Sequence, residues 1–168
     1  MRDQPVGDRM SQATGTEVLG LEETSMNVAA ILKMKGKGVF TASADTSLLD
    51  IAKLLEQHGI GCIVIEDEER KVVGIVSERD LVRAIGQSGP KVLKDPVSEY
   101  MTKAVVTARE ADTIDRLMSE MTTHRFRHMP IVERGRLIGI VSIGDVVKMR
   151  IAEAEMEAAA MREYIATG

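Results

Sequence analysis

The feature that most constrains this chain is a ten-residue phrase that occurs twice. Residues 74–83 read GIVSERDLVR, and residues 139–148 read GIVSIGDVVK. Each copy has a glycine, a short apolar run that ends in serine, two variable positions, an aspartate, and then apolar residues at helical spacing. In a chain of 168 residues, such a repeat indicates two copies of one supersecondary unit.

The similarity extends well beyond this phrase. VFTA at 39–42 corresponds to VVTA at 105–108, and the apolar positions that follow keep their phase in both copies. The copies differ in length at one hairpin tip, where a duplicated unit tolerates a change. We therefore interpret the chain as an internal duplication.

Each copy is predicted to fold in the order β-α-β-β-α after a short helical turn. Asp45 or Thr46 in the first copy, and Asp112 or Thr113 in the second, are the candidate caps of the amphipathic helix. That helix should end near His58 in the first copy and near His124 in the second. The other expected ranges are helical turns at 28–32 and 97–101, strands at 39–42, 61–65, 72–76, 105–108, 128–132 and 137–141, and closing helices at 79–86 and from 144 onward.

Neither copy is expected to be stable alone, because about 60 residues bury only a modest core. The strands are apolar on both faces and need cover on both sides. We expect an α/β, sandwich-like fold in which two pseudo-symmetric repeats pack sheet to sheet, followed by a long C-terminal helix. The predicted parts are a polar tail at 1–25, a first repeat at 26–88, a linker at 89–96, a second repeat at 97–150 and a helical extension at 151–168.

Composition narrows the class of protein. Aromatic residues make up 2% of the chain, so aliphatic and Met side chains must form the core. The net charge of −4, with both signs mixed, makes nucleic-acid binding an unfavoured prediction. Cys62 is the single cysteine, which excludes a disulfide within the chain and predicts a buried, reduced thiol. With no apolar run long enough to cross a bilayer and no secretory h-region, the sequence predicts a cytoplasmic protein without a membrane partner.

The repeated phrase, the MPIV strand and the amphipathic helices together resemble a tandem pair of cystathionine-β-synthase (CBS) domains, also called a Bateman module. The resemblance covers residues 26–150. It implies a stand-alone regulatory module that assembles as a flat homodimer and binds an adenine nucleotide such as AMP, ATP or NAD. It further implies energy or redox sensing, in which the ligand changes the relative pose of the repeats and a protein on another chain reads that change.

The repeated phrase can serve a nucleotide in a definite way. A strand ends, a serine follows, and a helix begins whose free N–H groups favour a phosphate. Asp80 and Asp145 lie in the first helical turn and can accept hydrogen bonds from the two hydroxyls of a ribose. The alternative is purely structural: Ser77 and Ser142 cap the helices, and the aspartates stabilise the first turn.

The resemblance implies two nucleotide sites, each combining the aspartate of one copy with strands of the other. The site at Asp145 is ranked first because Arg and His precede its MPIV strand and suit a phosphate. Its predicted residues are Lys35, Phe40, Ile60, Gly61, Cys62, Arg127, His128, Ser142 and Asp145. The predicted residues of the second site are Ser77, Arg79, Asp80, Val106 and Phe126.

Two basic segments have simpler explanations. HRFRH at 124–128 also fits a solvated strand entry, and KMKGKG at 33–38 lacks the spacing of a phosphate-binding P-loop. Two rival functions stay open: a structural or adaptor dimer without a nucleotide, and a nucleic-acid or signalling-nucleotide binder. No nucleophile, base and metal-ligand set stands at a recognised spacing, so we expect neither catalysis nor a metal or catalytic cofactor.

The C-terminal segment 146–166 is predicted to be one long helix. Its apolar positions fit a stripe imperfectly: Val146, Met149, Met156, Ala160 and Ile165. A Met-rich helix seldom stays exposed, so we expect this stripe to form a dimer contact rather than a solvated end.

Overall fold

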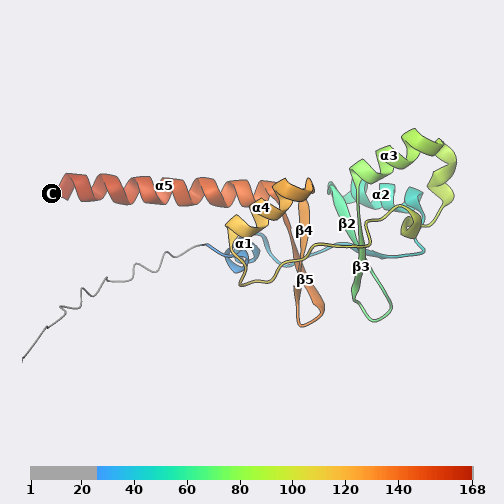
Figure 1. The fold of residues 1–168 in the computed structure, drawn as a ribbon, viewed down its shortest axis with the longest axis horizontal. Coiled ribbons are helices and arrows are strands. Elements are labelled where there is room, and N and C mark those ends of the chain that lie inside the picture. The colour runs from blue at the N-terminus through green and yellow to red at the C-terminus, as the bar shows by residue number, and fades with distance from the viewer. Residues whose placement is uncertain (1–25, 168) are drawn as a thin grey trace, which may run out of the picture.

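The structure is a computed structural model and describes residues 26–167. The predicted tail at 1–25 lies outside the described residues. The elements follow the predicted order (Figure 1), except that the strand predicted at 105–108 is missing from the second repeat. They are α1 (Val28–Lys35), β1 (Thr41–Ser43), α2 (Leu48–His58), β2 (Cys62–Glu66), β3 (Val72–Ser77), α3 (Glu78–Ser88), η1 (Pro90–Lys94), η2 (Val97–Glu99), α4 (Ile114–His124), β4 (His128–Glu133), β5 (Arg136–Ser142) and α5 (Ile143–Thr167).

The two sheets differ by one strand. In the first repeat β1 is parallel to β2, and β2 is antiparallel to β3. In the second repeat β4 and β5 are antiparallel, and the strand predicted at 105–108 is reduced to a single bridge between Ala108 and Ile131. The residue sequence explains the loss. Val64 donates its N–H to Phe40 O in the first repeat, whereas Pro130 occupies the matching position and has no N–H to donate.

The repeats exchange their leading segments. Helix α1 precedes the first repeat, yet Val28, Ile31 and Leu32 are buried in the core of the second repeat. In return, Val92 of η1 and Val97 of η2 are buried in the core of the first. Isolated β-bridges hold the exchanged segments in place, from Asn27 to Thr113 and from Ser47 to Pro96. Each repeat therefore completes its core with chain that precedes the other one.

A buried glycine marks the contact point of each exchanged segment. A methyl group on Gly74 would collide with the side chain of Met101, which follows η2. A methyl group on Gly139 would lie 2.6 Å from Cδ2 of Leu32 in α1. The glycine of the repeated phrase is thus required by close packing against an exchanged side chain.

The helix caps agree with the prediction in one repeat and correct it in the other. Thr113 caps α4 by accepting a hydrogen bond from the N–H of Arg116 at 3.2 Å, as expected. Helix α2 is capped by Ser47, not by Asp45 or Thr46. The Asp45 carboxylate instead accepts a hydrogen bond from Ser43 within the preceding turn.

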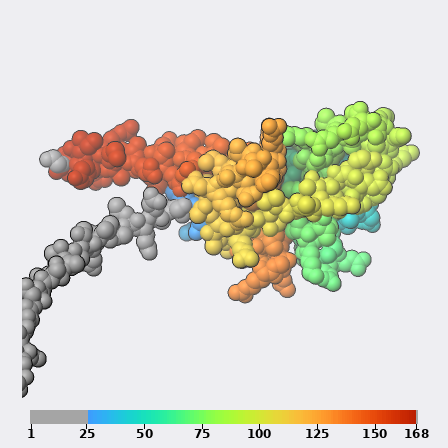
Figure 2. Space-filling model, viewed as in Figure 1, coloured from blue at the N-terminus to red at the C-terminus, as the bar shows by residue number. Residues whose placement is uncertain are grey.

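The last helix leaves the body of the molecule. Only the first turns of α5 pack on the second repeat, and the rest projects as a rod (Figures 1 and 2). Within residues 26–167, none of the helices combines the length and the apolar run that a bilayer crossing requires.

Candidate functional site

The serine and aspartate of each repeated phrase are bonded to each other. Asp80 Oδ2 accepts hydrogen bonds from the N–H and the Oγ of Ser77, both at 2.8 Å. Asp145 Oδ2 accepts the same two bonds from Ser142, at 2.8 and 2.9 Å. The pairs close the first turns of α3 and α5, which is the capping role weighed for these residues. The same geometry also holds each carboxylate beside the end of a strand.

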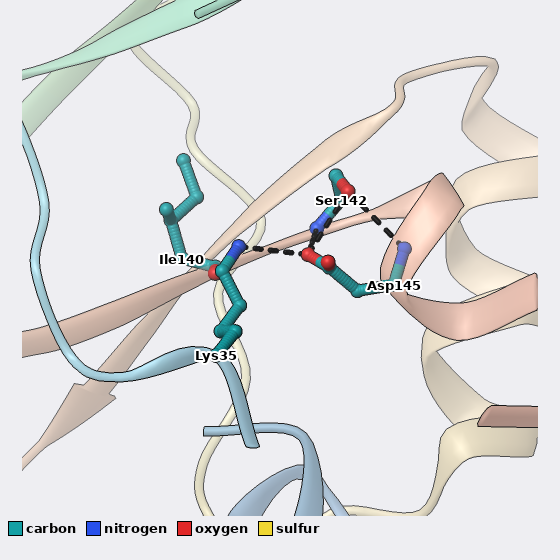
Figure 3. Close-up of polar contacts among 4 residues, drawn as sticks. All are labelled: Lys35, Ile140, Ser142 and Asp145. Atoms are coloured by element: carbon teal, nitrogen blue, oxygen red, sulfur yellow. Dashed lines mark hydrogen bonds and ion pairs between the residues drawn. The ribbon is translucent and has the colours of Figure 1, made fainter. Parts of the chain in front are cut away.

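The two carboxylates differ in what else they contact. Lys35, the last residue of α1, donates to Asp145 Oδ2 at 2.8 Å and to Ile140 O at 2.9 Å (Figure 3). Burial raises the pKa of Asp145, but the hydrogen bonds from Lys35 and Ser142 outweigh it and hold the pKa below its usual value. The exchanged helix α1 thus brings a cation from the first repeat onto the aspartate of the second.

A cavity of about 680 Å³ lies at Asp80, between the two repeats. Its volume is within the range of small-molecule sites. Side chains and backbone from both repeats line it: Gly61, Cys62, Ile75, Ser77, Glu78, Arg79, Asp80, Arg83, Thr102, Ala104, Val105, Val106, His124, Arg125, Phe126, Arg127 and His128.

The charged lining of the cavity is mostly basic. Arg79, Arg83, Arg125 and Arg127 line it together with two carboxylates, Glu78 and Asp80. Arg79 reaches across the cleft, where its Nη1 donates to the carbonyl of Arg125 at 3.5 Å. A guanidinium presents a planar set of donors that matches a phosphate, so this wall suits an anionic ligand.

Two titratable groups in the cavity wall are held in their neutral forms. Burial, reinforced by the charge of Lys35, lowers the pKa of His128. Burial raises the pKa of Cys62 to about 12, so its thiol stays protonated at neutral pH. Cys62 is buried and free, as the sequence predicts.

The residues predicted for the Asp145 site are divided between two places. Lys35, Ser142 and Asp145 come together in one polar cluster. The remaining predicted residues that line a cavity line the one at Asp80: Gly61, Cys62, Arg127 and His128. Phe40 stacks on His58 with ring centroids 3.8 Å apart, and Ile60 packs against the first core.

All five residues predicted for the second site line the cavity: Ser77, Arg79, Asp80, Val106 and Phe126. Sequence reasoning ranked this site second because the positions matching Arg127 and His128 are Gly61 and Cys62. It expected Arg127 of the other repeat at this site, where the structure places it, but it missed Arg125 beside it and Arg83, which lies one turn after Arg79 on α3. The four-residue spacing of Arg79 and Arg83 was the available signal, since it places both on one helix face.

A family model described as "CBS domain" matches residues 28–87 and 97–151. The chain is 30% identical to the mitochondrial CBS domain-containing protein CBSX3 of Arabidopsis thaliana, over 94% of this chain and 82% of that protein. The next two curated relatives are matched over 66% and 64% of their own lengths.

Solved structures share the fold. The CBS-domain containing protein ATU1752 of Agrobacterium tumefaciens is 47% identical and superposes with a TM-score of 0.72, covering 74% of this chain and 98% of that one. The CBS domain pair of protein MJ0100, in complex with 5′-methylthioadenosine and S-adenosyl-L-methionine, is 30% identical with a TM-score of 0.67, covering 76% of this chain and 97% of that one. A neighbour of this chain therefore binds adenosine-containing ligands.

Proposed function

Because this chain belongs to the CBS-domain family, we propose that it is a regulatory module that binds an adenine nucleotide between its repeats. The observation that carries the proposal is the cavity of about 680 Å³ at Asp80, which residues of both repeats line. A ligand held there contacts both halves at once, so it favours the relative pose that it fits best. The role is regulatory rather than catalytic.

We assign the roles within the cavity by chemistry. The Asp80 carboxylate accepts hydrogen bonds from the ribose hydroxyls, and Val106 and Phe126 provide an apolar wall for the base. Arg79, Arg83, Arg125 and Arg127 receive the phosphates. Among AMP, ATP and NAD, this number of guanidinium groups favours the ligands with more than one phosphate, and it disfavours S-adenosylmethionine, which has none.

The site at Asp145 is a second proposed site, and it differs from the first because a lysine already occupies its carboxylate. Its carboxylate already accepts a hydrogen bond from Lys35, so a ribose must displace that ammonium group before it can bind. We therefore place the Asp80 site first in affinity, in reverse of the order that the sequence favoured.

The remaining parts of the proposal rest on the resemblance. They are a homodimer, a partner protein on another chain that reads the pose of the repeats, and energy or redox sensing as the purpose. The cytoplasmic location stays a prediction, since a relative of the chain has the word mitochondrial in its name.

A thermal-shift panel tests the function. It uses AMP, ADP, ATP, NAD, NADH and S-adenosylmethionine on the wild type, Asp80→Ala and Asp145→Ala. A ligand at a hundredfold its dissociation constant adds roughly 2.7 kcal/mol, which means a shift of several degrees. We expect ATP or NAD to give such a shift in the wild type and in Asp145→Ala, and to give none in Asp80→Ala.

The Asp145→Ala protein is the matched control, because each variant removes the aspartate that bonds to the serine in its own copy of the repeated phrase. Only the ligand-induced shift is compared, which removes the loss of stability common to both. If no compound shifts any of the three proteins, the nucleotide proposal is wrong, and the adaptor function becomes the better explanation.

A further inference from the structure

Helix α5 has two faces with different surroundings. Val146 and Met149 are buried against the second repeat, and Arg150 pairs with Asp115 of α4. The residues predicted for a dimer contact therefore include two, Val146 and Met149, that the protein's own core already covers. The opposite face is exposed from the body to the end of the helix. Its large apolar residues are Val147, Ile151, Met161 and Ile165, exposed by 47%, 54%, 67% and 73%.

The exposed face follows a strict seven-residue repeat. Its members, which we call the α5 seam, are separated by alternating steps of four and three: Val147, Ile151, Ala154, Ala158, Met161 and Ile165. This is the spacing of positions a and d in a two-stranded coiled coil. Ile151, Ala158 and Ile165 then occupy position a, where Ile favours a parallel pair. Met149 occupies position f, so the seam points away from the protein's own body.

The charges beside the α5 seam distinguish the two possible directions. In a parallel pair, each position g faces position e of the next heptad on the other helix. Arg150 then faces Glu155 of the second copy, and Glu157 faces Arg162 of the second copy. Both contacts join opposite charges.

An antiparallel pair brings together like charges. With the seam residues in layers, Glu155 faces Glu155 of the second copy, and Glu157 faces Glu157 of the second copy. Lys148 faces Arg162 in the same arrangement. All of these contacts are repulsive, so the flanking charges select the parallel direction.

We propose that two copies of this chain associate through the α5 seam as a parallel two-stranded coiled coil. The outer part of α5, which stands clear of the body in Figure 2, then gains a partner along its apolar side. The two bodies lie at the same end of the coiled coil, each on the outer side of its own helix. The inference is independent of nucleotide binding, and its test uses protein without nucleotide.

The first experiment is cross-linking under mild oxidation. In a parallel pair, Met161 lies opposite Met161 of the second copy, so Met161→Cys should form a disulfide-linked dimer in high yield. In an antiparallel pair these residues are about 15 Å apart along the axis, too far for a disulfide. Cys62 gives little background, because it is buried and its thiol is protonated.

Glu163→Cys is the matched control. Glu163 is also exposed on the outer part of α5, but it occupies the outward-facing position f. We expect it to cross-link far less than Met161→Cys. Equal cross-linking of the two variants, or none with Met161→Cys, would overturn the proposal, even if the protein is a dimer through another surface.

Charge reversal provides a second test, by sedimentation equilibrium. Glu157→Arg faces Arg162 of the second copy and, by symmetry, turns two attractive pairs into repulsive ones. We expect it to weaken the dimer about tenfold. The double variant Glu157→Arg with Arg162→Glu restores both pairs and should return to wild-type affinity. If the single variant has no effect, or the double variant is weaker still, the parallel arrangement is wrong.

Discussion

The two serine–aspartate motifs of this molecule make the same hydrogen bonds and have different surroundings. At both, a serine and an aspartate form the same pair of hydrogen bonds at the end of a strand. Asp80 faces a cavity lined by arginines, whereas Asp145 is paired with Lys35. The difference comes from the exchanged segments. Helix α1 places Lys35 against the second repeat. The segment after Met101 lines the cavity at Asp80 with uncharged Thr102, Ala104 and Val105. The state of each site is therefore decided by residues outside the repeated motif.

Removing Lys35 should make the surroundings of Asp145 more like those of Asp80. Lys35→Met takes the ammonium group away from Asp145 and leaves its carboxylate to a ribose. We expect ATP titrated by calorimetry to bind one site in the wild type and two in the variant. We expect a loss of about 0.5–1 kcal/mol of stability, because the pair is only partly buried.

The opposite result would give Lys35 another role. If Lys35 instead contacts a phosphate of the bound nucleotide, the variant binds nucleotide less well and gains no second site. Lys37→Met is the control, because Lys37 follows in the same loop and pairs with Glu110 rather than Asp145.

The two motif glycines offer the next largest effect. Gly139→Ala pushes against Leu32, which is 1% exposed and fixed in the second core, so we expect a loss of about 3 kcal/mol. Gly74→Ala pushes against Met101, which is half-buried and flexible, so we expect about 1 kcal/mol. Urea unfolding of both variants measures the difference. Equal losses would mean that the two exchanged segments are packed equally tightly.

The ends of the matching helices α2 and α4 give a smaller contrast. Gly59 and Arg125 both adopt the left-handed conformation, with φ of 59° and 56°. Gly59→Ala should cost about 1 kcal/mol, and Arg125→Gly should gain about 0.5 kcal/mol. The measurement is thermal unfolding without nucleotide. A stabilised Gly59→Ala protein would show that the backbone at this cap relaxes.

The smallest effect concerns His128, whose counterpart in the first repeat is Cys62. Burial and then Lys35 lower its pKa in the folded protein, so the unfolded chain binds more protons as the pH falls below about 6.5. Stability is therefore lost below that pH until the folded-state pKa is passed. His128→Gln should flatten this part of the curve, measured by urea unfolding between pH 7.5 and 5. An unchanged slope would mean that the burial of His128 does not set the pH dependence of stability in this range.

Much of this fold could be predicted because the two copies show the same pattern of apolar and capping residues. The helix ends at His58 and His124 and the serine-to-helix junctions match the expected ranges. The prediction of a strand at 105–108 was wrong, because its loss depends on the missing N–H of Pro130, which lies elsewhere in the chain and accepts a hydrogen bond from Ala108.

The candidate site was harder to predict for the same reason. The repeated phrase identifies the motif residues directly in the sequence: Ser77, Asp80, Ser142 and Asp145. Which aspartate pairs with a lysine depends on where α1 packs, and α1 packs in the core of the second repeat. The sequence placed Lys35 at the Asp145 site, but it did not show that the lysine pairs with the aspartate itself.

The exchange of leading segments also sets the order in which the chain can fold during synthesis. Helix α1 is synthesised before the strands that the structure describes, yet its buried side chains pack in a core that is completed only by Val146 and Met149 of α5. The first repeat, in turn, waits for Val92 and Val97 to close its own core. Of the helices that the structure describes, the one synthesised first is thus among the last to complete its contacts. Contacts over such sequence distances slow folding, so the half that is translated first stays incomplete until Val92 and Val97 have been added.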